Sequence, residues 1–442
     1  MKRKIVLSVI VIATLFIFCY TSVTFLFSEE TKEVDQELLT DDRDIVELTF
    51  WRNVGNDSFN FAYEQIIADF EASHPHIKIN MVAQYWGHEY ELRLRTEIAA
   101  GSPPDIMTID SPNLGLYANT GSLLSLDTYM REEGNIEDIL EATLEGLVYE
   151  DEIYLSPIIE SSIGLFYNVH LFEEAGIPLP SGKPNEPMSW EEVLEIAQKI
   201  NDPEDGIYGI DPAQGFSTGE GPAYFKIPIL WQFGGEVLSP DGETAEGYLN
   251  SEESLGALQF YQDLYFEHEV ATMQLPPLAL ETDKLAMTIL GSWELTYLEK
   301  IMGLTLGEDF GVAPLPVGTD RVVPSGGWAV GISSRTNYPE EAWEFVKYLT
   351  GYEGTKKFVE ITGEIPARYS VAEDIPDLNE YPKNIFIQQV QEHSRIRPVT
   401  PAYSVISLSI KELFEDVGIK GRNVREAADD AVDKINRALE ED

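Results

Sequence analysis

The sequence predicts an α/β fold with mostly parallel sheets. Segments rich in β-branched and aromatic residues alternate along the chain with segments whose apolar residues recur at helical spacing. Strands that alternate with helices in this way build parallel sheets through βαβ crossovers. The length of 442 residues exceeds what one compact core holds, so we expect two or three domains.

The first elements are expected within residues 44–110. "DIVELTFW" is predicted to be a strand, and "SFNFAYEQIIADFEASH" a helix, because its apolar residues recur at helical spacing. The strand "IKINMVAQY" follows, and then the helix "HEYELRLRTEIAAG", which Gly101 closes. "PDIMTID" is predicted to be the third strand.

Later elements continue the same pattern. "SWEEVLEIAQKI" begins with Ser189 and Glu192 in the spacing of a helix capping box. "KLAMTIL" is predicted to be a buried strand, and "EEAWEFVKYLTG" and "NVREAADDAVDKINRALEED" to be helices. The sequence has no internal repeat and no long low-complexity linker in its folded part, so any domain boundary is expected within the α/β pattern.

The charge is strongly negative. There are 77 acidic and 30 basic residues, which gives a formal net charge of −47. Such a field repels nucleic-acid phosphates and anionic lipid surfaces, so nucleic acid is excluded as a partner. The acidity serves either solubility in saline or alkaline surroundings or an acidic binding face. Because net charge acts on solubility rather than on fold, we favour the first interpretation.

The N-terminus has the pattern of an export signal. "MKRK" precedes an uncharged apolar stretch that runs from Ile5 to Phe27. The stretch is also long enough to cross a bilayer as an uncleaved anchor, with its basic end inside. We expect residues 1–28 to form a signal or membrane anchor. Residues 29–43 are expected to form an acidic, disordered linker to an extracytoplasmic protein on the outer face of the cell membrane.

Tryptophans stand at the predicted strand ends, where ligands bind in open α/β sheets. Trp51, Trp86 and Trp293 end or follow strands, and Trp328 follows two glycines that allow close approach to the backbone. One tryptophan at a strand end packs the rim more often than it contacts a ligand. Four at one kind of position favour a shared aromatic cleft. Flat rings suit the apolar faces of a sugar, while amides and carboxylates bind its hydroxyl groups.

Six segments together resemble the extracellular solute-binding proteins (family 1) of bacterial ABC sugar importers, which are maltose-binding-protein-like. The segments occur in the family's order and cover roughly residues 45–370. They are "PDIMTIDSPNLGLYANTGSLLSLDTYM", "DEIYLSPIIESSIGLFYNVHLFEEAGIPLP", "SWEEVLEIAQKI", "LWQFGGEVLSPDG", "KLAMTILGSWEL" and "GGWAVGISSRTNYPEEAWEFVKYL…TGEIPAR".

The resemblance implies a two-lobed, type II periplasmic-binding-protein-like fold with a hinge between the lobes. We expect lobe 1 at residues 44–159 and 329–350, and lobe 2 at residues 160–328 and 351–442. It also implies a monomer that captures a carbohydrate by lobe closure and delivers it to an ABC permease. The number of aromatic residues favours an oligosaccharide. A separate ATPase is expected, because the chain has no GxxxxGK[ST] phosphate loop.

Carried onto this sequence residue by residue, the resemblance implies a set of ligand contacts. Trp293 is expected to be a stacking platform, and Trp328, beside Gly327, a second ring. Asp110 alternatively caps a helix, and polar cleft residues often bind local backbone instead. Arg368 alternatively pairs with a surface carboxylate, and Tyr224 alternatively belongs to the core. The full set is Trp51, Asp110, Ser111, Asn113, Glu160, Ser161, Tyr224, Trp231, Trp293, Gly327, Trp328 and Arg368.

Two positions depart from the family's pattern. Asp283 stands where a glycine is usual before "KLAM", so the geometry of this turn is left open. Cys19, the only cysteine, is the candidate for lipidation, but Phe18 stands where a lipoprotein signal has a small residue. A lipid anchor and an uncleaved apolar anchor both remain open. With no second cysteine, a disulfide framework is excluded.

Rival chemistry is less well supported. "GFSTG" fits the G-x-S-x-G nucleophile elbow, but its flanks "DPAQ" and "GEGP" favour a loop over the required strand and helix. His74 and His76 lack a third ligand at recognisable spacing, so we expect a helix-to-strand connection there and no metal or cofactor. A binding protein is therefore favoured over an enzyme. The alternative is a secreted carbohydrate-active hydrolase or esterase.

Overall fold

The computed structural model describes residues 45–84, 87–212 and 219–441. This part of the chain clusters as one compact unit. The predicted segments 1–28 and 29–43 lie outside the described residues, as do Cys19, Trp86 and most of the "GFSTG" motif.

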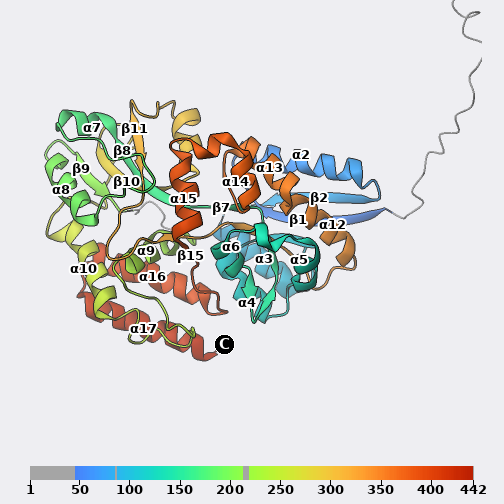
Figure 1. Cartoon of the computed structure of the whole chain (residues 1–442). Coiled ribbons are helices and arrows are strands. Elements are labelled where there is room, and N and C mark those ends of the chain that lie inside the picture. The colour runs from blue at the N-terminus through green and yellow to red at the C-terminus, as the bar shows by residue number, and fades with distance from the viewer. Residues whose placement is uncertain (1–44, 85–86, 213–218, 442) are drawn as a thin grey trace, which may run out of the picture. The chain divides into compact units, whose positions relative to one another are not determined.

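Within the described residues, the larger sheet has five strands in the order β2-β1-β3-β13-β6. Figure 1 shows β1 and β2 of this sheet beside helix α2. The predicted β1–α2–β2–α3–β3 alternation is confirmed, and β1 pairs in parallel with β2 and β3. Strand β13 runs antiparallel to β3, so its first residue, Trp328, lies opposite the last residue of β3, Asp110. The bounds are β1 Val46–Asn53, β2 Ile77–Gln84, β3 Ile106–Asp110, β6 Leu155–Pro157 and β13 Trp328–Ile332.

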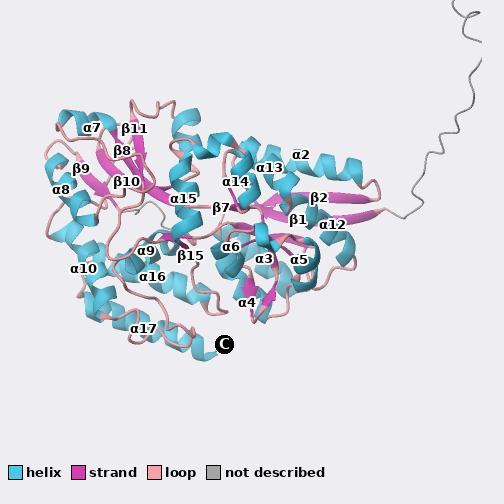
Figure 2. Ribbon diagram, in the orientation of Figure 1, coloured by secondary structure: helices cyan, strands magenta, loops and turns pink. Residues whose placement is uncertain are grey.

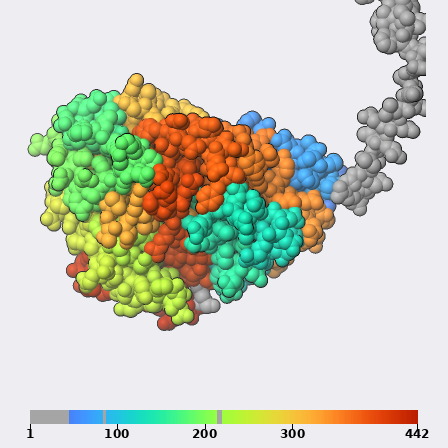
Figure 3. All heavy atoms as spheres, viewed as in Figure 1, coloured from blue at the N-terminus to red at the C-terminus, as the bar shows by residue number. Residues whose placement is uncertain are grey.

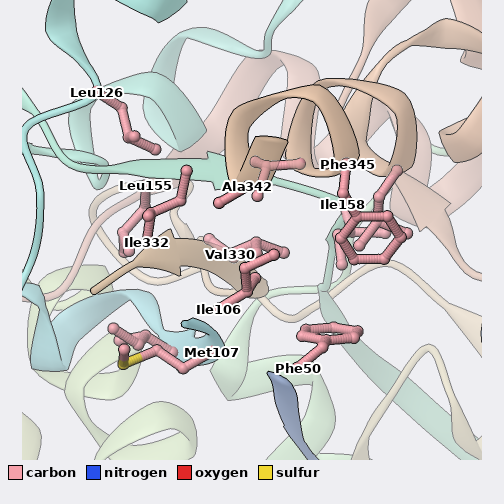
Figure 4. Packing of buried hydrophobic residues seen from close by; sticks show 14 of the residues in the cluster. Phe50, Ile106, Met107, Leu126, Leu155, Ile158, Val330, Ile332, Ala342 and Phe345 are labelled. Carbon is pink, nitrogen blue, oxygen red and sulfur yellow. The ribbon is translucent and has the colours of Figure 1, made fainter. Parts of the chain in front are cut away.

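Helices and apolar side chains enclose this sheet. The ring of Phe50 on β1 packs edge-on against Phe345, with 5.5 Å between ring centroids. Each fully buried apolar side chain of this size stabilises the fold by about 1.5–3 kcal/mol. The surrounding helices are α2 Asp57–Ser73, α3 His88–Ala100, α12 Pro339–Thr350 and α13 Tyr352–Thr362. Figure 4 shows the core, in which Phe50, Ile106, Met107, Leu126, Leu155, Ile158, Val330, Ile332, Ala342 and Phe345 are labelled.

A second sheet has the order β11-β8-β10-β9 within the described residues (Figure 2). Strand β10 is antiparallel to β8 and parallel to β9, and β11 is antiparallel to β8. The prediction of mostly parallel sheets is therefore wrong, since both sheets are mixed. Strands such as β13 enter a sheet after long connections, without a βαβ crossover to make them parallel. The bounds are β8 Ile163–Asn168, β9 Tyr208–Asp211, β10 Leu285–Gly291 and β11 Phe310–Ala313.

Four helices pack on one another around a separate apolar cluster in the described part of the chain. Tyr403, Ile406 and Ile410 on α16 are buried in this cluster. Helix α16 also contacts the short helix η1, Ser111–Asn113, which follows β3. The C-terminal helices therefore reach the end of the larger sheet. The four helices are α9 Gly221–Gln232, α10 Glu252–Phe266, α16 Tyr403–Gly418 and α17 Val424–Glu441.

Shorter elements connect these layers. In the space-filling view, the orange surface that includes α13 to α15 lies between the green surface around α7 and the teal surface around α5 (Figure 3). The helices are α4 Leu114–Asn119, α5 Asp127–Glu133, η2 Ile136–Asp138, α6 Glu141–Glu145, α7 Val169–Glu174, α8 Trp190–Ile200, α11 Glu294–Thr296, η3 Tyr297–Ile301, α14 Tyr369–Asp374, η4 Pro376–Asn379 and α15 Lys383–His393. The strands are β4 Val148–Tyr149, β5 Glu152–Ile153, β7 Ile159–Glu160, β12 Val323–Pro324, β14 Ile365–Pro366 and β15 Ser394–Arg395.

Several local predictions are confirmed. The capping box at Ser189 and Glu192 is formed in both directions, and Gly101 ends α3 in the left-handed conformation with φ of +79°. His74 lies in the connection between α2 and β2. Asp283, at the position where a glycine was expected, has φ of +56°. Its carboxylate accepts a hydrogen bond from Asn168 Nδ2 at 2.7 Å, which holds this residue in a backbone conformation that glycine adopts more readily.

Candidate functional site

A cavity of about 390 Å³ lies at the carboxyl end of β3. One wall comes from α3, the end of β3, η1 and the start of β13, and the other from the start of α9 and from α16. The antiparallel register of β13 and β3 places Trp328 and Asp110 next to each other in the first wall. The lining residues are Gly87, His88, Glu91, Leu92, Arg95, Asp110, Asn113, Gly219, Glu220, Trp328, Ser404, Ser407, Leu408 and Lys411.

A buried arginine joins the two walls of the cavity. The side chain of Arg397 is 1% exposed and forms ion pairs with Asp110 and Glu220. Its Nη2 lies 3.3 Å from Asp110 Oδ1, and its Nη1 lies 2.6 Å from Glu220 Oε1. A buried cation needs such paired, hydrogen-bonded carboxylates, because isolated charges are poorly tolerated in the interior. Arg397 therefore holds the end of β3 against the start of α9.

Further groups complete the surroundings of Arg397. Ser407 Oγ donates to Glu220 Oε2 at 2.6 Å, and the Tyr403 hydroxyl donates to Glu220 Oε1. The guanidinium carbon of Arg397 lies 5.0 Å from the ring centroid of Tyr224. Burial raises the pKa of both Asp110 and Glu220, while the Arg397 charge opposes that rise. Carboxylate oxygens held by hydrogen bonds and an aromatic ring, that of Tyr224, therefore surround Arg397.

Three of the predicted site residues line the cavity: Asp110, Asn113 and Trp328. The Trp328 ring packs edge-on against Tyr90, with 5.9 Å between centroids, so its position is set by α3 as well as by β13. Two more predicted residues, Tyr224 and Ser161, lie near Arg397, whose guanidinium packs on the Tyr224 ring. The Tyr224 hydroxyl is 2.9 Å from Ser161 Oγ.

Trp293 lies one step further from the cavity. Its ring centroid is 5.9 Å from that of Tyr224 and 6.2 Å from that of Phe225, and its Nε1 donates to Glu294 Oε1 at 3.1 Å. It follows β10, as predicted, and packs partly buried against the core of the second sheet. It is not among the described residues that line the 390 Å³ cavity.

Glu160, Ser161 and Gly327 meet where the chain passes between the two sheets. Glu160 is 1% exposed, and its carboxylate accepts hydrogen bonds from Thr143 Oγ1, Ser325 Oγ and the backbone N–H groups of Ser161 and Gly326. A Cβ on Gly327 would lie 1.9 Å from the carbonyl oxygen of Ile159, so only glycine fits here. Ser111, Glu160 and Gly327 line a separate space of about 10 Å³. In this structure Glu160 and Gly327 hold the backbone together at this crossing.

The remaining predicted residues are not among the described residues that line the cavity. Trp51 lies within β1, which continues to Asn53, and the Arg93 guanidinium lies 5.5 Å from its ring centroid. Trp231 is buried in the helical cluster, with Arg395 4.8 Å from its ring centroid. Arg368 is 2% exposed and donates to the carbonyl oxygens of Thr350 and Gly134.

Sequence reasoning missed several residues of the site: Glu91, Glu220, Arg397, Tyr403 and Ser407. In a chain with 77 acidic residues, nothing distinguishes Glu91 or Glu220 from the solvated carboxylates. Arg397 likewise stands in an ordinary context, between Ile396 and Pro398.

With this geometry described, the chain can be compared with known proteins. The family described as "Bacterial extracellular solute-binding protein" matches residues 56–356. A maltotriose-binding protein of Pyrococcus abyssi is 22% identical over 381 residues, which are 84% of this chain and 77% of that protein. A galactooligosaccharide-binding protein of Bacillus subtilis is 24% identical over 353 residues, 76% of each chain.

A solved structure agrees with these sequence matches. It is an ABC transporter solute-binding protein from Thermotoga lettingae bound with α-D-tagatose, and it is 26% identical to this chain. The TM-score is 0.76, and the match covers 89% of this chain and 99% of the other. The predicted type II solute-binding-protein fold is thereby confirmed.

The ionic contact at Arg397 can be tested by removing its cation. We expect Arg397→Met to lower the free energy of unfolding by about 3–5 kcal/mol at pH 8, because two mostly buried carboxylates lose their partner. Burial raises the pKa of both carboxyls, so their protonation neutralises them as the pH falls, and the loss should be smaller at pH 5. Urea unfolding followed by circular dichroism at both pH values measures the difference.

Arg395→Met is the matched control. Arg395 makes a bidentate ion pair with Glu236, with distances of 2.8 Å and 2.6 Å, but its side chain is 44% exposed. An exposed pair contributes about 1 kcal/mol or less, and the contact of Arg395 with the Trp231 ring about as much again, so this variant should lose much less stability than Arg397→Met. Equal losses in the two variants, or a loss for Arg397→Met that does not change with pH, would contradict the role given to Arg397.

Proposed function

Because the chain belongs to the bacterial extracellular solute-binding proteins, a family of binding proteins and not of enzymes, we propose that it captures a carbohydrate outside the cytoplasm. As a monomer, it delivers this ligand to the permease of an ABC importer, and a separate ATPase drives transport. The hydrolase or esterase alternative has no support from the family.

The observation that carries the proposal is the composition of the 390 Å³ cavity. Trp328 offers an aromatic surface for the apolar face of a sugar ring. Asp110 and Asn113 beside it offer acceptors and donors for hydroxyl groups. The volume is near the lower end of the range of about 300–1,000 Å³ for ligand sites, which favours a short oligosaccharide. The relatives named for maltotriose and galactooligosaccharide support this ligand class.

We further propose that the cavity closes around its ligand. Asp110 in one wall belongs to the lobe predicted at residues 44–159 and 329–350, and Trp328, the last residue of the segment 160–328 predicted for the other lobe, lies beside it. The wall with Glu220 and α16 belongs to the lobe predicted at 160–328 and 351–442. The strand crossing at Glu160 and Gly327 is the proposed hinge, because a few residues at such crossings absorb the backbone change. A ligand that contacts both walls binds the closed form better and shifts the population toward it.

Ligand binding is tested by calorimetric titration of residues 29–442 with a sugar set that includes maltotriose, galactooligosaccharides and D-tagatose. We expect one of these sugars to bind at one ligand per chain without nucleotide. We expect Trp328→Ala to weaken that binding roughly tenfold to a hundredfold, by analogy with the loss of about 1–3 kcal/mol when an aromatic stacking partner of a nucleobase is truncated.

Trp293→Ala tests a second proposed ligand contact, and Trp343→Ala is the control for a loss of stability. Trp293 remains a proposed stacking platform, and a loss of affinity in Trp293→Ala would place it at the ligand in the bound form. Trp343 is buried in the core of the larger sheet, so its truncation should reduce stability and leave the affinity of the folded protein unchanged. Unchanged affinity in Trp328→Ala, or release of shortened sugar products, would contradict the proposal.

Closure is tested by small-angle scattering. Adding a saturating amount of the bound sugar should reduce the radius of gyration of the soluble protein and change its tryptophan fluorescence, because two walls move together around Trp328. A tightly bound sugar that leaves the scattering curve unchanged would indicate a rigid pocket.

Attachment to the membrane is a separate proposal. No helix in the described ranges 45–84, 87–212 and 219–441 is both long and apolar enough to cross a membrane. We propose that residues 1–28 hold the protein at the outer face, either as an uncleaved anchor or through lipid on Cys19. Mass spectrometry of the membrane fraction should recover the N-terminal peptide if the anchor is uncleaved. A mature chain beginning at diacylated Cys19 would show a lipoprotein, and a chain cleaved elsewhere would contradict both.

A further inference from the structure

We propose that Glu91 is a specificity-determining contact of the cavity and that its Oε1 accepts a hydrogen bond from a hydroxyl group of a neutral solute. This inference rests on the proposed function, since it names a contact and a ligand chemistry for the same cavity. Glu91 is not part of the predicted set of ligand contacts.

One carboxylate oxygen of Glu91 accepts a hydrogen bond, and the other has no donor among the described residues. Its Oε2 accepts a hydrogen bond from the Tyr117 hydroxyl at 2.6 Å. Its Oε1 is buried, and no described residue donates to it. Glu91 is 9% exposed and lines the cavity. A buried acceptor without a donor is unfavourable, and a ligand hydroxyl that enters the cavity would satisfy it.

Helix α3 is held firmly against the sheet at this point. The hydroxyl group of Tyr90, the neighbour of Glu91, donates to the backbone oxygen of Thr108 at 2.8 Å. The Tyr90 ring also packs edge-on against Trp328. The acceptor and the aromatic surface are therefore fixed relative to each other by one residue. A sugar ring stacked on Trp328 would have hydroxyl groups at its edge for Glu91 to bind.

The charges around Glu91 disfavour an anionic ligand. Arg95 on α3 is its cationic neighbour, with Nε 3.9 Å from Glu91 Oε2. Asp110 on β3 and Glu220 at the start of α9 face it as further carboxylates. His88 and Lys411 also line the cavity, and Lys411 pairs with Glu415 at 3.6 Å. An anionic solute would meet a cluster of carboxylates next to the free oxygen, so we expect it to be rejected.

The protonation of Glu91 supplies a readout. Burial raises the pKa of Glu91 to about 7, against the opposing effects of the Tyr117 hydrogen bond and of Arg95. A donated ligand hydroxyl stabilises the charged form, so binding should lower this pKa and release a proton. Affinity for the sugar should therefore rise between pH 6 and pH 8.

The same pKa affects stability without ligand. The folded pKa lies above the value of about 4.3 for an unperturbed glutamate. The contribution of Glu91 to stability is thus fully present below pH ~4 and is lost as the pH rises through 7. The glutamine in Glu91→Gln cannot ionise. The melting temperature of this variant, relative to that of the wild type, should therefore increase as the pH rises from 5 to 8.

The test compares Glu91→Gln with the matched control Glu89→Gln. Both substitutions remove one negative charge from α3. Glu89, however, is exposed and is not among the described residues that line the cavity. Maltotriose and D-tagatose are titrated into each protein by calorimetry at pH 6, 7 and 8. We expect Glu91→Gln to weaken binding of the sugar about tenfold at pH 8 and to abolish the pH dependence, since a charged acceptor forms the stronger hydrogen bond. Glu89→Gln should behave as the wild type.

The outcomes separate this inference from the proposed function. Equal affinities of the wild type and Glu91→Gln at all three pH values would overturn it. So would melting temperatures that differ by the same amount at pH 5 and pH 8. Failure of the wild type to bind either sugar would count against the carbohydrate proposal instead. The melting curves would then still decide whether Glu91 is the buried, ionising acceptor of the cavity.

Discussion

The Arg397 guanidinium is buried between Asp110 and Glu220, and this contact joins three parts of the chain that are far apart in sequence. A charged group at this depth is tolerated only when its partners are in place, so β3, the start of α9 and the segment before α16 must converge. The cavity lies at that point of convergence. One ionic contact therefore determines both the packing of these segments and the presence of oriented carboxylates in the cavity wall.

Strand direction is the second constraint. Because β13 runs antiparallel to β3, Trp328 at its start lies beside Asp110 at the end of β3. The residues just before Trp328 pass so close to the backbone of Ile159 that Gly327 admits no side chain. Glu160, which binds backbone N–H groups at this crossing, stabilises the connection, whereas Asp110 and Asn113 line the cavity. Structural and cavity-lining roles are thus divided among residues that the sequence pattern grouped together.

The extreme acidity of the chain has a consequence for its few basic residues. With 30 basic residues against 77 acidic ones, cationic partners are scarce and many carboxylates depend on solvent. Around the cavity, however, Arg397 and Arg95 are placed against Asp110, Glu220 and Glu91. These pairs leave hydrogen-bond acceptors facing the cavity without a large uncompensated charge. Such a lining is suited to hydroxyl groups and unsuited to phosphates or carboxylates.

The sequence by itself determined the local elements and the family. Helical periodicity, the capping box at Ser189 and the glycine at position 101 act over a few residues, so α2, α3, α8 and the strands β1 to β3 were predicted correctly. Only the tertiary structure decided which strands run antiparallel and which side chains meet. Arg397, Glu220 and Glu91 acquire their roles through partners more than a hundred residues away or through burial, neither of which leaves a periodic signal. Trp231 and Arg368 carried motif signals, yet their burial among other partners was visible only once the chain was folded.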